Sequence, residues 1–411
     1  MTVSFIKFRR TSEDRMAEIL KSVRILDLSQ YMAGPYGTLI LGDLGAEVIK
    51  FEAPEGGELS RMVRQYKHKG ESAYYMSFNR NKKSVTMNFK SDKAREVFYE
   101  LVKISDVVWD NFRPGILEKF KIDYESLKKV NPKIISCSVS GFGSNSPYKD
   151  RPALDLLIQG LGGVMSFTGE PGRPPARLGY PMGDLGGGVF AVMAVLAALY
   201  YREITGKGQR IDIAMLDAQI SLMTYRAQYY FLEKVIPEPI GSGHVSAIPI
   251  RAFKARDGKY LTVEASHEKF FQNLCAVFRM ESLGKDPRFS TMDARLTNRD
   301  ALFEIMEKKF LERDRDQWVD LLTKGDVPAG PVNNLAEALS DPSVLARNMV
   351  VPVNHLGEEI KMVGNPIKMS EMGPEVFEAP PTLGQHTEEV LSKFLGYSKE
   401  QIDDLRKEGA I

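Results

Sequence analysis

Three carboxylates stand in residues 155–188, a stretch with a Gly- and Pro-rich turn and a closing run of three glycines. They are Asp155, Glu170 and Asp184. A carboxylate can serve as a general acid or base, or as a nucleophile that forms a covalent intermediate. A helix start following Asp184 offers free N–H groups to an anion, and glycines 186–188 would let a ligand approach the main chain closely. The alternative is that Asp184 only caps a helix and the glycines only make turns.

The composition favours a soluble, two-domain protein with no bulk charge. The chain has 411 residues, of which 43% are hydrophobic and 27% charged, and 55 basic residues nearly balance 54 acidic ones. A net charge of +1 gives no field that would steer the chain to nucleic acid or a membrane, so local basic clusters must meet any anionic ligand. The two cysteines, Cys137 and Cys275, provide neither a disulfide framework nor metal-ligand spacing, which fits a cytoplasmic protein without a metal site.

Alternating strands and helices place this stretch at the end of an α/β domain. Residues 23–29 and 47–54 are expected to be strands that flank a helix, and the pattern continues for some 120 residues, which predicts a mainly parallel sheet. The turn after the first strand lacks GxGxxG, so the usual dinucleotide chemistry is not expected. Loops 31–35, 111–115 and 141–147 follow strands, where ligands bind in open α/β sheets.

The rest of the chain suggests an inserted smaller domain. Residues 189–201 form an apolar run, expected to be a buried helix and too short to span a bilayer. An antiparallel hairpin is expected around Asp257–Gly258, followed by amphipathic helices. The predicted organisation is an N-terminal extension (1–22, without a signal peptide), a large domain (23–226), a small α+β domain (227–327) and a return segment (328–411) that completes the large domain.

Several segments, taken in order, resemble the class III (CaiB/BaiF) CoA-transferases. They are VRILDLSQYMAGPYGTLILGDLGAEVIKFEAP, FNRNKKSVTMNFKS, DNFRPGILEKF, NPKIISCSVSGFG, residues 155–188, TGKGQRIDIAMLDA, DVPAGPVN and LGQHTEEVL. The resemblance covers nearly everything after Lys21. It implies a Rossmann-like large domain built from both chain ends, a small inserted domain and two subunits threaded through each other as interlocked rings.

The resemblance also implies the reaction. A carboxylate attacks an acyl-CoA thioester and forms a mixed anhydride; CoA thiolate returns to give an enzyme thioester; an acceptor acid then repeats the exchange. Coenzyme A and a carboxylic acid are therefore the expected substrates, with no nucleic acid or membrane partner. A carboxylate suits this task because its anhydride and thioester conserve the energy of the substrate thioester.

Six positions are expected to bind CoA. Lys90, Asn111, Phe112 and Lys119 fall where family members contact its adenine, ribose and phosphates, and Tyr31 and Met32 lie in the first strand-end loop. Lys90 belongs to a basic cluster with Asn79, Arg80, Lys82 and Lys83, which by itself reads as a solvated edge strand guarded by lysines. Gly241–Ser242–Gly243 corresponds to a glycine-bearing loop that shields intermediates in some members, in a shorter form.

At the expected nucleophile the sequence departs from the pattern that we take as typical of the family, TGEPDGPP: here TGEPGRPP places Gly172 where that pattern has an aspartate. Glu170 is the nearest carboxylate on the same turn and ranks first, with Asp155 and Asp184 as further candidates. Arg173 and Arg177 beside this turn are candidates for pairing with the second carboxyl of a dicarboxylate.

Two alternatives to a self-sufficient transferase remain. A non-catalytic CoA-binding subunit would rely on a partner chain for the nucleophile, so the assembly is a homodimer or a heteromer with a related subunit. An acyl-CoA racemase of the related α-methylacyl-CoA type would need a histidine base, which falls at Leu154 here, with its two aspartates at Asp155 and Asp184.

Overall fold

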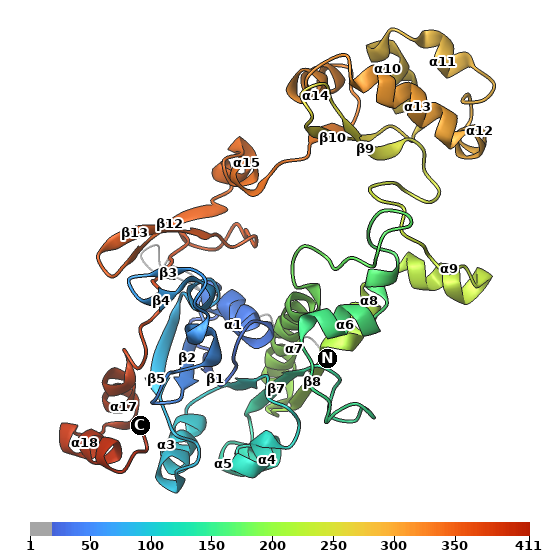
Figure 1. The fold of residues 1–411 in the computed structure, drawn as a ribbon. Coiled ribbons are helices and arrows are strands. Elements are labelled where there is room, and N and C mark those ends of the chain that lie inside the picture. The colour runs from blue at the N-terminus through green and yellow to red at the C-terminus, as the bar shows by residue number, and fades with distance from the viewer. Residues whose placement is uncertain (1–18) are drawn as a thin grey trace, which may run out of the picture. The chain divides into compact units, whose positions relative to one another are not determined.

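The computed structural model describes residues 19–411, which divide into two compact units (Figure 1). Of the described residues, the first unit contains 19–162, together with Gly179–Ala227 and Leu345–Ile411. The second contains Gly163–Leu178 and Gln228–Val344. The second unit is therefore larger than the predicted small domain of 227–327, because the turn at 163–178 and the segment 328–344 belong to it. Part of the predicted extension, residues 1–18, lies outside the described residues.

A six-stranded parallel sheet forms the centre of the first unit, as the alternation of strands and helices predicts. Its order is β5-β2-β1-β6-β7-β8. The strands are β1 (Arg24–Asp27), β2 (Glu47–Glu52), β5 (Lys82–Thr86), β6 (Val107–Asp110), β7 (Ile135–Ser140) and β8 (Arg210–Ala214). All five neighbouring pairs are parallel. The carboxyl ends of all six strands therefore lie along one edge of the sheet.

Alternate residues of the strands feed two separate cores, one on each face of the sheet. Ile25 and Val107 pack into a core with α1 (Ala33–Asp43) and α7 (Met182–Thr205). Their neighbours Leu26 and Val108 pack into the other core, with α3 (Asp92–Lys103) and α5 (Tyr124–Val130). This period of two, with apolar residues at both phases, is typical of a parallel sheet covered on both faces.

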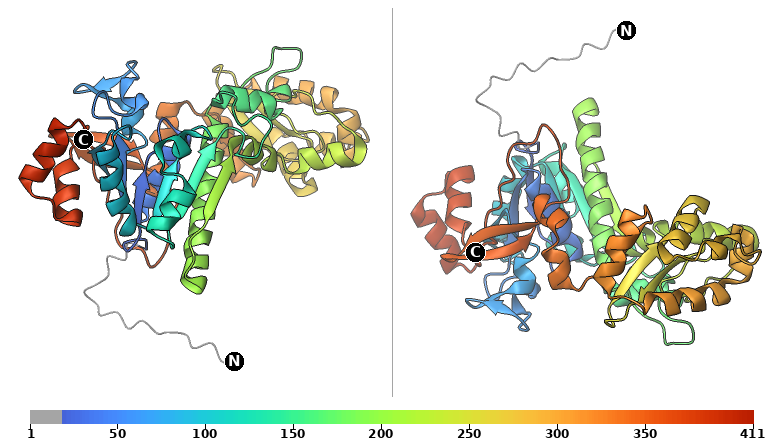
Figure 2. Two further views of the ribbon diagram at one scale, coloured as in Figure 1. Left: turned by 90° about the horizontal axis from the view of Figure 1, so that it is seen from below. Right: turned by 90° about the horizontal axis from the view of Figure 1, so that it is seen from above.

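Segments from the far end of the chain complete the second of these cores. Helices α17 (Thr387–Leu395) and α18 (Lys399–Lys407) pack beside α3, and α17 also covers the edge strand β5 (Figure 2). The His386 N–H donates to the carbonyl of Ser84 at 2.9 Å, and the Thr86 N–H donates to Thr387 Oγ1 at 3.1 Å. The edge that the basic residues of β5 would have guarded is therefore covered by the chain itself.

Helix α7 is longer than the apolar run predicts, because it begins at Met182 and runs for 24 residues. It is long and apolar enough to cross a membrane by length and composition alone, since its most apolar window has a mean hydropathy of 1.8. The length argument drawn from residues 189–201 is therefore wrong. The helix packs along α1 and β7, and 44% of that window is buried inside the protein. A core helix passes the same test of length and composition.

Short elements connect the parts of the first unit. They are η1 (Leu59–Met62), β3 (Lys67–His68), β4 (Glu71–Ser72), α2 (Ala73–Met76), α4 (Ile116–Phe120), α6 (Asp155–Leu161), η2 (Val164–Ser166), α8 (Met215–Ser221), β12 (Val350–His355) and β13 (Glu358–Val363), with η2 counted in the second unit. Strands β12 and β13 form an antiparallel hairpin. Helices α9 (Tyr225–Glu233) and α16 (Pro342–Ala346) lie at the points where the chain changes unit.

The second unit is an α+β structure with its own core. The hairpin predicted around Asp257–Gly258 is present as β9 (Ile250–Lys254) and β10 (Tyr260–Glu264), to which β11 (Ala329–Pro331) adds a third antiparallel strand. Helices α10 (Glu268–Phe278), α11 (Glu281–Lys285), α12 (Met292–Thr297), α13 (Arg299–Phe310) and α14 (Arg315–Lys324) surround it, and α15 (Leu335–Leu339) follows. Asn334 precedes α15 and forms a capping box with Glu337.

Candidate active site

Asp184 lies in the first turn of α7, not before it. Its carboxylate makes no hydrogen bond or ion pair with any residue between 19 and 411. Burial, with a smaller contribution from the negative charge of Asp155, raises the pKa of Asp184 from 3.8 to about 7. This carboxylate is half-buried and unpaired, and its pKa is near neutral pH. A carboxylate that caps a helix would instead accept hydrogen bonds from N–H donors.

Asp155 performs that capping role instead. It is the first residue of α6, and its Oδ1 accepts the N–H of Gly183 at 2.9 Å while Oδ2 accepts from Gln159 Nε2 at 2.7 Å. One orphan donor at the start of α7 is thus satisfied from a neighbouring helix. Asp155 therefore holds the helix start that carries Asp184, and its charge acts on Asp184 from nearby.

Tyr74 of α2 faces the same acidic environment. Burial, together with the charge of Asp184 and smaller contributions from Glu58, Tyr31 and Asp155, raises the pKa of Tyr74 to about 12. The phenol therefore stays protonated at neutral pH and remains a hydrogen-bond donor. Tyr74 and Glu58 escaped the sequence analysis, because an aromatic or acidic residue in an irregular segment carries no periodic signal.

Tyr31 and Met32, two of the residues expected to bind CoA, lie where β1 leads into α1. Tyr31 is 43% exposed and has the unusual φ of 60°, whereas Met32 is 9% exposed. The Tyr31 N–H donates to Glu58 Oε2 at 3.1 Å. The structure thus presents the Tyr31 side chain at the carboxyl edge of the sheet and holds Met32 inside.

The other four expected contacts lie along the same edge but differ in exposure. Lys90 follows β5 and Lys119 lies in α4; both are exposed, and neither has an ion-pair partner in the described part of the chain. Phe112 packs against the second core. Asn111 uses both ends of its amide on the main chain of Gln30, accepting from its N–H and donating to its carbonyl, each at 2.8 Å.

The two lysines belong to segments that meet. Phe89 and Phe120, which precede Lys90 and follow Lys119 in the sequence, contact each other with ring centroids 6.3 Å apart. Two unpaired ammonium groups on joined segments at the carboxyl edge fit a phosphate-bearing ligand.

Most of the remaining basic cluster is buried, unlike the solvated edge strand that its sequence indicated. Asn79, Arg80 and Lys82 are each no more than 3% exposed. Arg80 pairs with Asp43, and Lys82 with Asp27 at 3.1 Å. Lys82 of β5 thus turns inward to a buried carboxylate, whereas Lys83 of the same strand stays half-exposed and pairs with Glu47 and with Glu389 of α17.

The glycines of α7 serve packing, not ligand approach as their spacing first indicated. A Cβ on Gly188 would lie 2.6 Å from the carbonyl oxygen of Ala33, and one on Gly187 would lie 3.1 Å from Met215. Gly37 of α1 faces Gly188 in turn. Small residues on both helices let α1 and α7 approach closely, which fixes the start of α7 relative to the carboxyl edge.

Glu170 and Gly172 belong to the second unit. Glu170 is exposed, and its carboxylate lies against the main chain of Gly241, where a Cβ would be 2.7 Å from both of its oxygens. The Gly241 N–H donates to Gly169 at 2.8 Å, so the glycine-bearing loop is fastened to this turn. Gly172 has a φ of 72°, and no described atom lies within 4 Å of the position that a Cβ would take. Arg173 and Arg177 are exposed.

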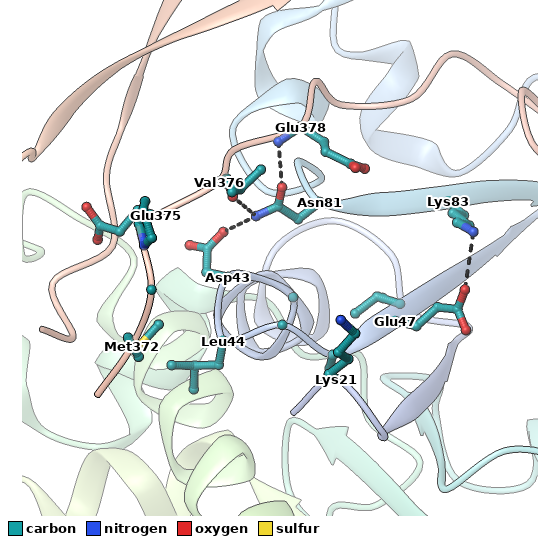
Figure 3. A pocket seen from close by; sticks show the side chains of 16 residues that line it. Lys21, Asp43, Leu44, Glu47, Asn81, Lys83, Met372, Glu375, Val376 and Glu378 are labelled. Carbon is teal, nitrogen blue, oxygen red and sulfur yellow. Dashed lines mark hydrogen bonds and ion pairs between the residues drawn. The ribbon is translucent and has the colours of Figure 1, made fainter. Parts of the chain in front are cut away.

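Two cavities accompany these segments. One of about 640 Å³ lies in the second unit and is lined by Glu170, Ser242, Arg251, Tyr260, Arg299 and Phe303, among others. The other, of about 360 Å³, lies in the first unit beside the end of α1 and the start of β2 (Figure 3). Asn81 there donates to Asp43 and to the Val376 carbonyl, and Lys83 pairs with Glu47. The cavity of the first unit thus lies at the amino edge of the sheet, opposite the carboxyl edge where Tyr31 and Asn111 lie.

Neither cysteine is part of this arrangement, since Cys137 and Cys275 are both buried thiols. Within residues 19–411, no group of three or more His, Cys, Asp or Glu side chains is arranged to hold a metal ion.

Comparison with known proteins gives a consistent result. The family model described as CoA-transferase family III matches residues 20–387. A mouse succinyl-CoA:glutarate CoA-transferase is 36% identical over 394 residues, covering 95% of this chain and 90% of its own. An acetyl-CoA:oxalate CoA-transferase from Acetobacter aceti is 38% identical over 348 residues, 84% and 88% of the two chains. A CAIB/BAIF family protein from Brucella suis has a crystal structure that superposes with a TM-score of 0.83 at 35% identity, covering 91% of this chain and 99% of that one.

Proposed function

Since the chain belongs to CoA-transferase family III and transfers CoA between an acyl-CoA and a carboxylic acid, we propose that Asp184 is the carboxylate that carries the acyl group. The observation that carries this proposal is its isolation: it is half-buried, has no hydrogen-bond partner among the described residues, and has a pKa raised to about 7. A carboxylate freed from donors and partly desolvated is a stronger nucleophile than a paired one.

The reaction then follows from balanced acyl exchanges. Asp184 attacks the thioester carbon of the donor, the C–S bond breaks, and a mixed anhydride and CoA thiolate result. The thiolate attacks the aspartyl carbonyl, the donor acid leaves, and the enzyme holds a thioester. The acceptor carboxylate attacks that thioester to form a second anhydride, and the returning thiolate releases acceptor-CoA and restores Asp184. Each step passes through an oxyanion, for which the protonated Tyr74 is the nearby donor candidate.

The other two candidates fit less well. Asp155 is engaged by Gly183 and Gln159, so it would have to give up bonds that hold α7. Glu170, which the sequence ranked first, is exposed, where water competes with the anhydride. With Asp184 in this role, Gly172 is no longer evidence for a silent partner subunit. A racemase is also disfavoured, because Leu154 replaces the base and its side chain is 73% exposed.

We further propose that the acceptor is a short dicarboxylic acid and that CoA lies over the carboxyl edge of the sheet. Glutarate and oxalate, the acceptors in the names of the two relatives, are both dicarboxylates. Lys90 and Lys119 would meet the phosphates of CoA as point charges. A cytoplasmic location is also part of the proposal, since Cys137 and Cys275 are both free thiols.

An interlocked homodimer is the assembly we propose for this chain. Helix α6 exposes Leu156, Leu157 and Leu161 at 53%, 45% and 47%, and α7 exposes Tyr200 and Ile204 at 71% and 66%. Apolar patches of this extent on helices of the first unit favour burial against a second subunit. Light scattering after size exclusion at micromolar protein should show no monomer, and a clean monomer would contradict the ring architecture.

The decisive experiment traps the covalent intermediate. The purified chain is incubated with succinyl-CoA, quenched with hydroxylamine or borohydride, and digested with trypsin. Peptide 178–202 contains Asp184 but neither Asp155 nor Glu170, so its mass shift assigns the nucleophile directly. An adduct on peptide 178–202 supports the proposal, whereas an adduct on the preceding peptide, which holds Asp155 and Glu170, would rule out Asp184 as the nucleophile. No adduct with any acyl-CoA would favour the partner-subunit alternative.

A further inference from the structure

Asn111 lies at the carboxyl edge of the sheet, yet both ends of its side-chain amide form hydrogen bonds within the protein. Oδ1 accepts the Gln30 N–H and Nδ2 donates to the Gln30 carbonyl, both at 2.8 Å. Gln30 lies 81 residues earlier, in the loop between β1 and α1. Because the N–H and the carbonyl of Gln30 are both bonded to one planar amide, the orientation of the main chain on each side of Gln30 is fixed, as it would be by a neighbouring strand.

The main-chain groups on either side of Gln30 are held in the same manner. The Ser29 carbonyl accepts from Lys50 Nζ at 2.7 Å, and the Tyr31 N–H donates to Glu58 Oε2 at 3.1 Å. Lys50 is fully buried, Glu58 is 2% exposed, and the two charges lie 3.9 Å apart. A buried ion pair is costly unless its remaining hydrogen-bonding capacity is used, and here the loop backbone uses it.

The contacts of Asn111, Lys50 and Glu58 with the β1–α1 loop, called the clamp below, account for the strained conformation of Tyr31. A non-glycine residue with a φ of 60° persists only when its surroundings determine it. The peptide before Tyr31 is fixed by Asn111 and its own N–H by Glu58. Two residues further on, the Ala33 carbonyl lies against Gly188 of α7, where a Cβ would be 2.6 Å away, so the fixed loop adjoins the start of the helix that carries Asp184.

We propose that Asn111 and Glu58 are positioning residues that hold Tyr31 and the β1–α1 loop in place against the first turns of α7, which carry Asp184, and that Asn111 acts through this clamp, not as a contact to CoA. The inference rests on the proposed role of Asp184. Loss of the clamp lets the loop relax toward an unstrained φ, so the bound acyl group is misplaced relative to the nucleophile. Misplacement of this kind lowers turnover more than it lowers affinity.

The first arm of the test needs no activity. Hydrogen–deuterium exchange of the full chain is followed in peptides that cover residues 28–33, for the wild type, Asn111→Ala and Asn131→Ala. Asn131 is a matched control, because its side-chain amide also bonds to main-chain groups far in the sequence. Its Nδ2 donates to the carbonyls of Val102 and Ser105, each at 3.0 Å, which precede the amino end of β6. Faster exchange at 28–33 in Asn111→Ala alone is expected; unchanged exchange there would overturn the clamp.

The second arm measures the kinetic consequence. We expect kcat of CoA transfer to fall roughly 10- to 100-fold in Asn111→Ala and Glu58→Gln, while the dissociation constant for CoA, from calorimetry, changes by less than about threefold. Asn131→Ala should lose thermal stability with kcat within about twofold of wild type. A CoA affinity that falls as steeply as kcat in Asn111→Ala would instead make Asn111 a ligand contact.

A conservative variant adds a pH signature and a safeguard against unfolding. In Asn111→Asp the introduced carboxylate still accepts from the Gln30 N–H but repels its carbonyl, and protonation restores the donor. Its kcat relative to wild type should therefore rise as the pH is lowered from 8 to 5, and a constant ratio would contradict the clamp. If the wild type transfers no CoA to any acid tested, the proposed function fails, whereas the exchange experiment still decides the clamp.

Discussion

The turn around Glu170 and the start of α7 carry the same chemical group in opposite circumstances. At Glu170 the carboxylate is exposed and lies in an irregular turn, in which Gly169 and Gly172 both have a positive φ. At Asp184 the carboxylate stands on a regular helix whose glycines pack against α1 and whose first N–H groups are partly satisfied by Asp155. If Asp184 is the nucleophile, as we propose, a rigid helix start and the absence of donors to the carboxylate matter more for its reactivity than closeness to an irregular turn.

Removing each carboxylate gives the largest contrast. Asp184→Asn should lower kcat by at least about 10³-fold, because only the covalent step is lost, while CoA affinity stays nearly intact. Glu170→Gln should retain activity within about tenfold. Steady-state CoA transfer from succinyl-CoA to glutarate measures both. A larger loss of kcat in Glu170→Gln than in Asp184→Asn would contradict the assignment of Asp184 over Glu170.

The lysines at the carboxyl edge come next in expected size. Lys90→Ala combined with Lys119→Ala should weaken CoA binding about tenfold at low salt, since each removes an unpaired ammonium from the phosphate region. The difference from wild type should shrink as ionic strength rises. Lys308→Ala with Lys324→Ala, on helices of the second unit, serves as the control. Equal CoA affinity in all three proteins, measured by calorimetry, would return the two lysines to a solvent-exposed role.

A methyl group distinguishes the two kinds of glycine. Gly188→Ala places a Cβ 2.6 Å from the Ala33 carbonyl and should destabilise the first unit by roughly 1–3 kcal/mol through overpacking. Gly172→Ala meets open space and suffers only its positive φ, a cost of about 1 kcal/mol. Urea unfolding of both variants provides the values. If Gly172→Ala proves the more damaging, packing against α1 is not what fixes the start of α7.

The smallest effect concerns stability against pH. Because the folded pKa of Asp184, about 7, exceeds its usual 3.8, the unfolded chain loses this proton first, and stability falls as the pH rises from about 4 to 7. Asp184→Asn removes that loss. Its melting temperature should match that of wild type near pH 4 and exceed it by roughly 2–4 °C at pH 8. A difference that does not grow over this range would contradict an unpaired, half-buried carboxylate.

The sequence reveals the elements here better than their contacts. Periodicity and turn residues predict the strands of the parallel sheet and the hairpin at Asp257–Gly258, because these depend on nearby residues. They also single out Asp155 and Asp184. They do not reveal that Asp155 caps the helix carrying Asp184, since that bond joins positions 28 residues apart. Likewise, nothing local shows that Lys82 finds Asp27, 55 residues away, and so points inward.

The cover over strand β5 has a consequence for how the protein forms in time. His386 and Thr387 bond to Ser84 and Thr86 across some 300 residues of chain. During synthesis, β5 therefore waits with an open edge while the entire second unit is made, and contacts of such long sequence separation close slowly. Over that interval the open edge of β5 offers unpaired main-chain groups to any other strand, until residues near 386 arrive to cover it.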